Sequence, residues 1–371
     1  MAAQKNAIRL LDYEIAPLPG LKMQLQTDSL PSIDDMQHEI ARQFASFRSL
    51  PASSPLQSFT RLSFAPASAL EFVLSVNILE DHGTRNFEST RAALAAVLDS
   101  TASGSVDRID SNDLSKDQLK TIGTYTALEA SYRFFAEQQS DMAGSVGGSS
   151  HERSPYHPFD LSSASANAID QTSDAASSVA IPMLPLVATP DEIQNWHKLI
   201  LPSAISHCFR ANQQEVFTTR SSGVVFLYLN PGLVAAHMSN FFDTWFATMQ
   251  ELASHSPADL CPLLIRFAAW VLSRFLFIHP FTNGNGRIGR LLVQFILNYI
   301  CPFPVPFACS REIYLQCIEQ SQPSGSTLPD ELAPPAALAY LILSSVWRSW
   351  QSQSRAILTE NVPSACSVTK Q

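Results

Sequence analysis

Apolar residues recur every three to four positions along most of the chain, which is the spacing of one face of an α-helix. This periodicity predicts helices over residues 69–79, 89–98, 116–137, 233–252, 260–278, 286–299, 311–320 and 336–350. A further helix, over residues 190–201, should begin at Thr189-Pro190-Asp191-Glu192, because Thr is a good N-cap and Pro fits the first helical position. The pattern therefore predicts the all-α fold class.

One stretch departs from the helical spacing. Residues 215–229 are rich in Val, Phe, Thr and Tyr on both sides of the turn-forming sequence Arg220-Ser221-Ser222-Gly223. β-Branched and aromatic residues that flank a turn are typical of a β-hairpin. We therefore expect one small hairpin attached to the helices.

Low-complexity sequence is concentrated in residues 142–180, which are rich in Ser, Ala, Gly and Asp. Such a segment cannot bury enough apolar surface to offset its ordering entropy, so we interpret it as a flexible surface insertion. The chain then divides into an N-terminal region of unclear structure (1–68), a helical region (69–141), the insertion (142–180), a helical core (181–350) and a tail (351–371).

Composition and charge exclude some classes of function. The chain has 371 residues, 46% of them hydrophobic, which is enough for a sizeable core. Its formal net charge is -9, and no long basic run is present, so we do not expect nucleic acid as the main partner. The six cysteines show no Cys-x-x-Cys spacing for zinc and are expected to be free thiols in a reducing compartment.

The most apolar stretch covers residues 260–281. It contains Arg266 and Arg274 and ends in His279-Pro280, so a buried helix explains it better than a membrane span. Residues 1–20 lack the basic start and uninterrupted apolar run of a signal peptide. We therefore expect a soluble protein of the cytoplasm or nucleus.

The end of this apolar stretch runs into an unusual loop. Residues 279–290 have the sequence His-Pro-Phe-Thr-Asn-Gly-Asn-Gly-Arg-Ile-Gly-Arg. Pro280 disfavours helical geometry at His279, so the helix should end there. Gly284 and Gly286 allow backbone N–H groups to point at one spot, and the start of the next helix adds a partial positive charge.

Two arginines complete this loop. Arg287 and Arg290 lie three residues apart in the first turn of the next helix, and therefore on the same face. A histidine, a nest of amides and two arginines predict an anion site with a titratable base beside it. The alternative is a plain helix–loop–helix in which the glycines serve the turn and the arginines face solvent.

Residues 279–290 resemble the signature of the Fic family (Fido superfamily), His-Pro-Phe-x-(Asp/Glu)-Gly-Asn-Gly-Arg-x-x-Arg, and match all but one of its defined positions. The resemblance covers residues 180–345 and, more loosely, 70–140. It extends to the helix before the core, to the entry of the hairpin and to its exit, at Ile193-Gln194-Asn195-Trp196-His197, Phe209-Arg210 followed by Val216, and Tyr228-Leu229-Asn230-Pro231.

The resemblance implies a Fic-fold helical bundle with a β-hairpin flap. It also implies an enzyme, a protein adenylyltransferase that moves AMP from ATP onto a hydroxyl side chain of a target protein in the presence of Mg²⁺. His279 would be the general base that takes the proton of that hydroxyl, a role suited to an imidazole near neutral pH.

The same resemblance assigns the remaining roles. The Gly284 and Gly286 amides, with Asn285, would cradle the phosphates, while Arg287 and Arg290 would hold the β- and γ-phosphates. The flap would bind the target chain by strand addition, and its residues would be Val216, Phe217, Val225 and Phe226. Two residues that align loosely with nucleoside contacts, and that have a structural role as the alternative, are Tyr314 and Gln322.

Asn283 is the one departure from the signature, because the family has Asp or Glu there to bind Mg²⁺. An amide oxygen can ligate Mg²⁺ but brings no charge. We therefore expect weaker metal binding, or a different arrangement of nucleotide and metal.

Many Fic proteins carry an inhibitory helix with the pattern (Ser/Thr)-x-x-x-Glu-(Gly/Asn), whose Glu pairs with the second signature Arg. Residues 76–81, with the sequence Val-Asn-Ile-Leu-Glu-Asp, are the best candidate, although Val76 and Asp81 depart from the pattern. Glu80 would then pair with Arg290, and the enzyme would be autoinhibited. The alternatives are an ordinary acidic residue at a helix end and a downstream brake at Glu360.

Other functions remain open at this site. Some relatives use the same residues to remove AMP, and Asn283 keeps open the transfer of another nucleotide or phosphate-containing group. An inactive Fic fold that only binds proteins is a further alternative. The sequence identifies neither the target protein nor the oligomeric state, so a homodimer stays open. We interpret His197, His207 and His255 as packed or surface histidines.

Overall fold

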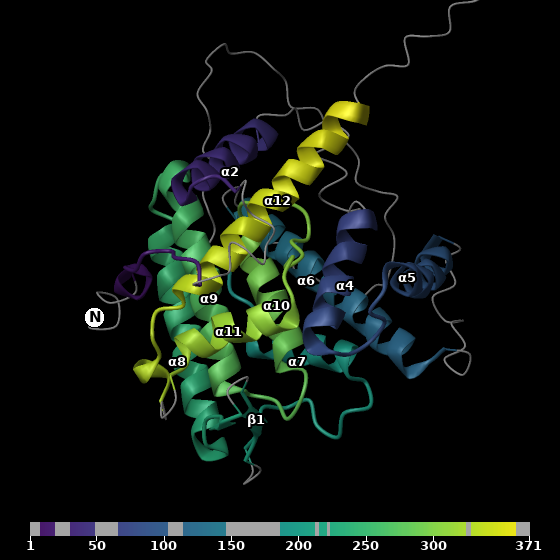
Figure 1. The fold of residues 1–371 in the computed structure, drawn as a ribbon, viewed down its shortest axis with the longest axis vertical. Helices are drawn as coiled ribbons and strands as arrows, with labels where there is room; N and C mark the ends of the chain where they lie inside the picture. The colour runs from purple at the N-terminus through teal and green to yellow at the C-terminus, as the bar shows by residue number, and fades with distance from the viewer. Residues whose placement is uncertain are drawn as a thin grey trace, which may run out of the picture.

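A computed structural model describes residues 8–18, 30–48, 66–102, 114–145, 186–211, 215–220, 223–323 and 328–360. These residues form a helical bundle with one two-stranded antiparallel hairpin, which confirms the predicted fold class (Figure 1). The elements are η2 (Ile8–Leu11), α2 (Ile33–Arg48), α4 (Pro66–Glu80), α5 (Phe87–Ala102), α6 (Lys116–Ser145), α7 (Pro190–Ile200), β1 (Phe217–Thr219), β2 (Val225–Leu227), α8 (Pro231–Leu252), α9 (Pro257–Ile278), α10 (Asn285–Leu297), α11 (Arg311–Ser321), η4 (Pro329–Glu331) and α12 (Ala336–Glu360).

Helix α9 is the centre of the bundle, and α2, α8, α10 and α12 pack around it (Figure 1). The side chain of Ser256 caps its start by accepting a hydrogen bond from the Asp259 amide, and its last residue precedes His279. It is long and apolar enough to cross a membrane, yet most of it is buried inside the fold. The helix therefore serves as the core of the bundle, as the two arginines in its sequence predicted.

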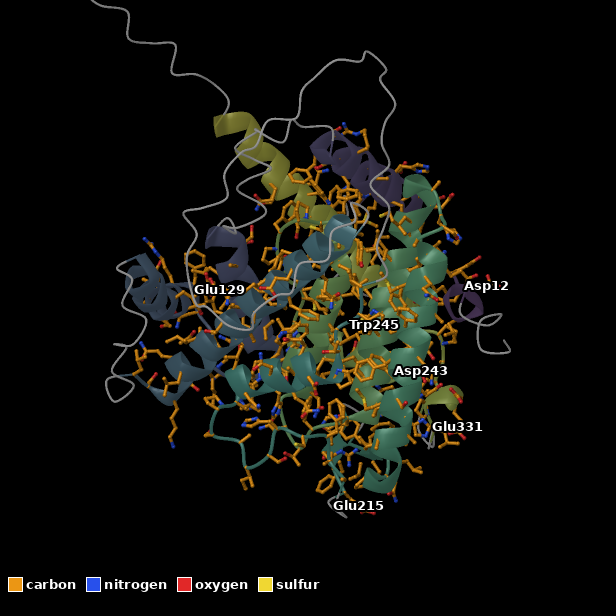
Figure 2. All side chains as sticks on the ribbon, turned by 180° about the vertical axis from the view of Figure 1, so that it is seen from behind. Asp12, Glu129, Glu215, Asp243, Trp245 and Glu331 are labelled. Carbon is orange, nitrogen blue, oxygen red and sulfur yellow. The ribbon has the colours of Figure 1, made fainter. Side chains whose placement is uncertain are left out.

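Helix α8 shows how the apolar periodicity directs one face inward. Trp245 is fully buried, whereas Asp243, two residues earlier, points outward (Figure 2). Phe241 stacks on Trp270 of α9 at a ring-centroid distance of 5.7 Å. Burying one such aromatic side chain contributes about 2–3 kcal/mol, so α8 is firmly attached to α9.

Helix α7 is held against α6 by a close backbone approach. A Cβ atom at Gly123 of α6 would collide with the carbonyl oxygen of Leu199, so only glycine allows this spacing. The start of α7 is the predicted one: Thr189 accepts a hydrogen bond from the Glu192 amide at 3.2 Å, and Pro190 is the first helical residue. The position of α7 matters because it lies beside the loop between α9 and α10.

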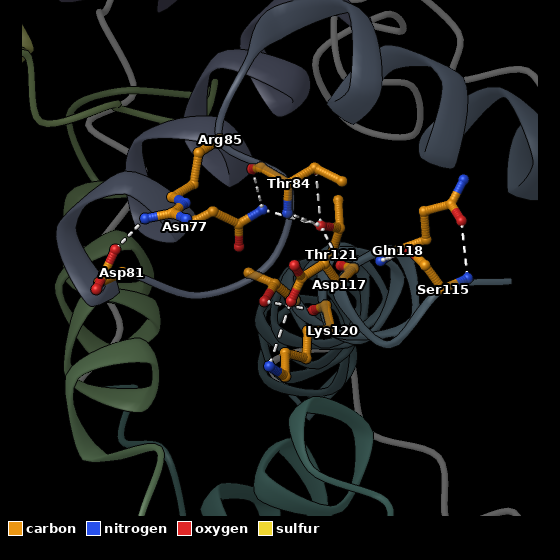
Figure 3. Close-up of polar contacts among 10 residues, drawn as sticks. Asn77, Asp81, Thr84, Arg85, Ser115, Asp117, Gln118, Lys120 and Thr121 are labelled. Carbon is orange, nitrogen blue, oxygen red and sulfur yellow. Dashed lines mark hydrogen bonds and ion pairs between the residues drawn. The ribbon is translucent and has the colours of Figure 1, made fainter.

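Helix α4 ends in a turn that a buried polar cluster fastens to α6. Asn77 donates hydrogen bonds of 3.0 Å to the Thr84 carbonyl and to the Thr121 hydroxyl, which also accepts from the Thr84 amide (Figure 3). Asp81 and Gly83 have φ angles of 56° and 71°, in the left-handed region, and they reverse the chain within this turn. The cluster fixes the direction in which the end of α4 points.

Several helices differ in extent from those expected. Helix α2 was not predicted, because residues 1–40 mix polar and apolar positions with scattered prolines. Helix α6 continues through the start of the expected insertion to Ser145, and the rest of that insertion lies outside the described residues. Helix α12 continues into the expected tail as far as Glu360; the side chain of Glu360 is among the parts left undescribed.

Candidate active site

Residues 279–284 connect α9 to α10, and we call them the signature loop. The loop begins at His279, whose backbone is left-handed at φ 51° and ψ 58° and thus leaves the helix where Pro280 predicted. This strained conformation is held by Arg210, which donates hydrogen bonds to the carbonyls of His279 (2.6 Å), Ile278 (3.1 Å) and Leu229 (2.7 Å). The Phe-Arg segment before the hairpin therefore orients the loop.

The imidazole of His279 is in the form that can accept a proton. Its ring stacks on Tyr228 at 3.7 Å between centroids, and its Nδ1 lies 3.3 Å from the carbonyl oxygen of Leu276. A carbonyl oxygen only accepts hydrogen bonds, so Nδ1 carries the hydrogen and Nε2 has a free lone pair. Burial lowers the pKa of His279 to about 3, so the ring is neutral near pH 7.

Asn285 closes the signature loop with its side chain. Its Oδ1 accepts from the Phe281 amide at 2.9 Å, and its Nδ2 donates to the Phe281 carbonyl at 2.7 Å. Both polar ends of the side chain are thus used within the loop, which leaves only its backbone for a phosphate. Phe281 is buried in a stack with His197, at 4.0 Å and 9°, and has a structural role.

The peptide between Asn283 and Gly284 is tightly restrained. Gly284 has φ 82°, and its amide donates to Oδ1 of Asn283 at 2.7 Å. The carbonyl of Asn283 accepts from Nε2 of His197 at 3.0 Å. The Gly284 amide, which we expected to meet a phosphate, is therefore occupied by the neighbouring side chain.

The two arginines of α10 form a buried cationic site. Arg287 and Arg290 are each 2% exposed, and in each guanidinium the Nε and Nη1 atoms have no hydrogen-bond partner. Tyr314 of α11 lies under Arg290, with the guanidinium 5.1 Å from the ring centroid. Buried donors normally find acceptors, so these atoms point to a ligand that brings its own.

Glu80 reaches this cationic site from the end of α4. Its Oε1 accepts from Nη2 of Arg290 at 2.6 Å, so the expected ion pair is present. The carboxylate also lies directly against Gly286, where an added Cβ would collide with it. Burial favours the neutral acid, but Arg290, Arg287 and Arg311 outweigh it and lower the pKa of Glu80. A carboxylate thus occupies part of the anion site.

Two arginines also bind the backbone at the end of α4. Arg290 donates to the Val76 carbonyl at 3.4 Å, and Arg311 donates to the Leu79 carbonyl. Cations at a helix C-terminus satisfy its free carbonyls and interact favourably with the helix dipole. Arg311 was not predicted, because only the fold brings it to α4.

The hairpin forms with Phe217 paired to Leu227 and Thr219 paired to Val225. Its outer side chains are exposed: Phe217 by 64% and Val225 by 58%. Phe226 instead is buried against Phe277 of α9, with the Arg220 guanidinium 3.7 Å from its ring centroid. Val216 precedes β1, and its carbonyl accepts from the Tyr228 amide at 3.1 Å.

The remaining candidates lie elsewhere or have other contacts. Gln322 is buried and donates to the Ser273 carbonyl at 3.1 Å, a contact within the core. Nδ1 of His255 lies 3.1 Å from the Glu251 carbonyl at the end of α8. His197, interpreted as a packed or surface histidine, is packed at 1% exposure. It also contacts the signature loop and His207, which nothing in the sequence spacing indicated.

The structure also tests the fit of Mg²⁺ to these residues. Among the residues that the structure describes, no group of three or more His, Cys, Asp or Glu side chains could hold a metal. The signature loop offers the neutral oxygen of Asn283, which is exposed but accepts from the Gly284 amide. A Mg²⁺ ion would therefore depend mainly on oxygens brought by a ligand.

Comparison with known proteins identifies the class of this domain. Residues 187–297 match the model of the Fic/DOC family, and they contain α7, the hairpin, α8, α9 and α10. Over these residues the chain is therefore similar to the Fic/DOC family. A Fido domain-containing protein of Dictyostelium discoideum is 46% identical over 52 residues, which are 14% of this chain and 36% of that protein.

Three solved structures share the fold. A Fic domain-containing signaling protein of Bacteroides thetaiotaomicron has a TM-score of 0.55 at 19% identity, over 87% of this chain and 97% of that one. A Fic family protein of Desulfovibrio desulfuricans has a TM-score of 0.52 at 12% identity, over 89% of this chain and 76% of that one. Fic-1 of C. elegans has a TM-score of 0.51 at 18% identity, over 97% of this chain and 83% of that one. The Fic/DOC family, which residues 187–297 resemble, has members that are typically nucleotidyl- or AMP-transferases.

Proposed function

We propose that this chain is an autoinhibited protein adenylyltransferase, which transfers AMP from ATP to a hydroxyl side chain of a target protein. The observation that carries the proposal is a neutral histidine without a hydrogen on Nε2 at one end of the signature loop and, at the start of the helix that follows the loop, two buried arginines whose Nε and Nη1 atoms lack partners. A base and a polyanion site are the two parts that this transfer requires.

In the proposed reaction, Nε2 of His279 takes the proton of the target hydroxyl while its oxygen attacks the α-phosphorus of ATP. The bond from that phosphorus to the bridging oxygen breaks, and pyrophosphate leaves. Arg287 and Arg290 balance the charge that develops on the leaving group. Nearby phosphates favour the imidazolium, so they raise the pKa of His279 from its low value and strengthen it as a base.

The flap is the proposed site of the target chain. Its exposed apolar side chains are Phe217, Val225 and Leu227, and Tyr228, the residue after β2, stacks on His279. A target strand paired to the hairpin would be held through main-chain hydrogen bonds, and these would present its hydroxyl to the base.

Glu80 is the proposed brake. Its carboxylate uses Nη2 of Arg290 and lies against Gly286, so it competes with a phosphate for the same donors and the same space. Removal of AMP from a modified target, the reverse activity that the sequence leaves open, would use the same residues. We expect the purified chain to transfer little AMP.

Mg²⁺ would be held by the phosphates of the nucleotide with Asn283 as its protein ligand. Bound there, it would neutralise part of the phosphate charge. Rotation of the Asn283 side chain toward such an ion would also free the Gly284 amide that it now occupies.

The test is the incorporation of labelled AMP from ATP by the native chain, by Glu80→Gly and by Glu80→Gly with His279→Ala. We expect labelling to rise at least about tenfold in Glu80→Gly, because loss of a buried ion pair of about 1.4 kcal/mol or more shifts the competition by that factor. The label should disappear when His279 is also replaced.

The matched control is Asp81→Asn, which removes the exposed acid next to Glu80 that pairs with Arg85. It should leave labelling at the native level. No labelling by a folded Glu80→Gly chain that binds ATP would exclude AMP transfer and point to another nucleotide. Absence of ATP binding as well would favour the protein-binding alternative.

A further inference from the structure

His197 and His207 form a pair next to the signature loop, outside the residues that the Fic signature contains. Their Nδ1 atoms are 3.0 Å apart, and their ring centroids are 5.2 Å apart. His197 lies on α7 and is 1% exposed, whereas His207 lies on the connection from α7 to the hairpin and is half-buried. The pair thus links the interior of α7 to the surface.

The contacts determine where the hydrogens lie. Nε2 of His197 is 3.0 Å from the Asn283 carbonyl, which can only accept, so Nε2 carries a hydrogen. The ring of His197 is 1% exposed and stacks on Phe281, and burying an unpaired charge is costly, so the ring is neutral and its Nδ1 carries no hydrogen. Nδ1 of His207 must then carry the hydrogen of the 3.0 Å contact. His207 therefore donates to Nδ1 of His197, and Nε2 of His197 donates to the Asn283 carbonyl of the loop.

The accepting carbonyl belongs to the peptide before Gly284, which has φ 82°. A peptide that precedes a glycine can flip at low cost, because glycine accepts both signs of φ. A flip here would exchange the directions of the Asn283 carbonyl and the Gly284 amide, so that a carbonyl oxygen would face the side where the Gly284 amide is expected to meet a phosphate. The hydrogen bond from His197 opposes this flip, and Asn283 Oδ1 restrains the amide end of the same peptide.

The connection that carries His207 restrains the start of the loop, and α7 restrains its end. Three residues later, Arg210 donates to the His279 carbonyl at the start of the loop. Behind the loop, His197 stacks on Phe281, and its ring and Leu201 lie closest to where a Cβ on Gly284 would be. The loop is therefore enclosed by α7 and by the connection that follows it.

We propose that His207 and His197 are positioning residues for the phosphate-binding loop: His207 fixes the tautomer of His197, and His197 holds the Asn283 carbonyl away from the anion site. This role rests on the proposed function, since it is phosphate binding that a flipped peptide would weaken.

The first test reads the tautomers by long-range ¹H–¹⁵N NMR of the full chain labelled at histidine, at pH 7.5. The signals are assigned with His197→Gln and His207→Asn. We expect hydrogen on Nε2 of His197 and on Nδ1 of His207. Hydrogen on Nδ1 of His197, or on Nε2 alone of His207, would overturn the proposal, and neither outcome depends on catalysis.

The second test compares His207→Ala with His207→Asn in the Glu80→Gly background. Asparagine keeps an N–H donor near the position of Nδ1, whereas alanine removes it. We expect His207→Ala to raise the dissociation constant for ATP about three- to tenfold, the effect of one neutral hydrogen bond. His207→Asn should restore it to within about twofold. Equal values for the two variants would mean that His207 only fills space.

The backbone amide NMR signals of Gly284 and Gly286 report on the conformation of the loop in the absence of nucleotide. They should shift in His207→Ala and return in His207→Asn, and unchanged signals would reject the positioning role. If these shifts and the tautomers are as expected while Glu80→Gly transfers no AMP, the proposed function has failed and the positioning of the loop stands.

Discussion

Asn283 is the residue at which this chain differs from the Fic signature, and its side chain does two things. Its oxygen restrains the Gly284 amide at 2.7 Å, and it stands where the family supplies a charged ligand for Mg²⁺. A neutral amide oxygen can accept from the Gly284 amide, but it offers Mg²⁺ no charge, and a bound ion would need the same oxygen. Under the proposed function, the loop thus exchanges affinity for Mg²⁺ for an ordered peptide.

Restoring the acid should reveal this exchange. We expect Asn283→Asp, in the Glu80→Gly background, to lower the Mg²⁺ concentration for half-maximal AMP transfer about tenfold. The reason is that a carboxylate adds a charge that the amide lacks. Initial rates measured over a range of Mg²⁺ concentrations give this half-maximal concentration. The control is Thr282→Asp, which places an acid one position away. Equal Mg²⁺ requirements for the native and Asp residues would show that the phosphates alone hold the metal.

At the scale of secondary-structure elements, helix α4 owes its direction to the cluster around Asn77. Asn77→Ala should reduce the free energy of unfolding by about 1–3 kcal/mol, because the Thr84 carbonyl and the Thr121 hydroxyl lose a buried partner. It should also loosen Glu80 and raise AMP transfer above the native level. Hydrogen exchange of residues 77–84 together with labelling measures both effects.

The control for this variant is Ser75→Ala, on the same helix, where the hydroxyl bonds only within α4 to the Phe72 carbonyl. It should change neither exchange nor labelling. If Asn77→Ala lowers stability but leaves the turn protected and the enzyme silent, the cluster supports the fold and not the brake.

Much of this arrangement was predictable from the sequence, and the physical reason differs between elements. Apolar spacing located most of the helices because each buries one face, and Pro280 located the end of α9. The predicted ends of α6 and α12 were too early, because polar residues occur both in the last turns of a helix and in the loop after it. The contact of His197 with Asn283 joins residues 86 positions apart, and periodicity carries no information about such pairs.

For the molecule as a whole, two histidines are buried in neutral form at the site. The pKa values of His197 and His279 are lowered from 6.5 to about 4 and about 3, so below pH 6.5 the unfolded chain binds protons that the folded chain does not. Stability should therefore fall as the pH drops from 6.5 toward 4, by up to about 1.4 kcal/mol per pH unit for each histidine.

Urea unfolding at pH 7, 6 and 5 measures this slope. His197→Gln should make the slope shallower, whereas His38→Gln, at an exposed position of α2, serves as the control. A slope that His197→Gln leaves unchanged would show that this ring is protonated in the folded protein.

Under the proposed function, the contact between Glu80 and Arg290, 210 residues apart in the chain, makes the carboxylate a tethered competitor of ATP. The apparent dissociation constant for ATP is then the intrinsic one divided by the fraction of molecules in which Glu80 is displaced. Every loss of about 1.4 kcal/mol in the attachment of α4 multiplies that fraction by ten. Anything that binds near the end of α4 would therefore control nucleotide occupancy at a constant supply of ATP, without touching the residues that carry out the chemistry.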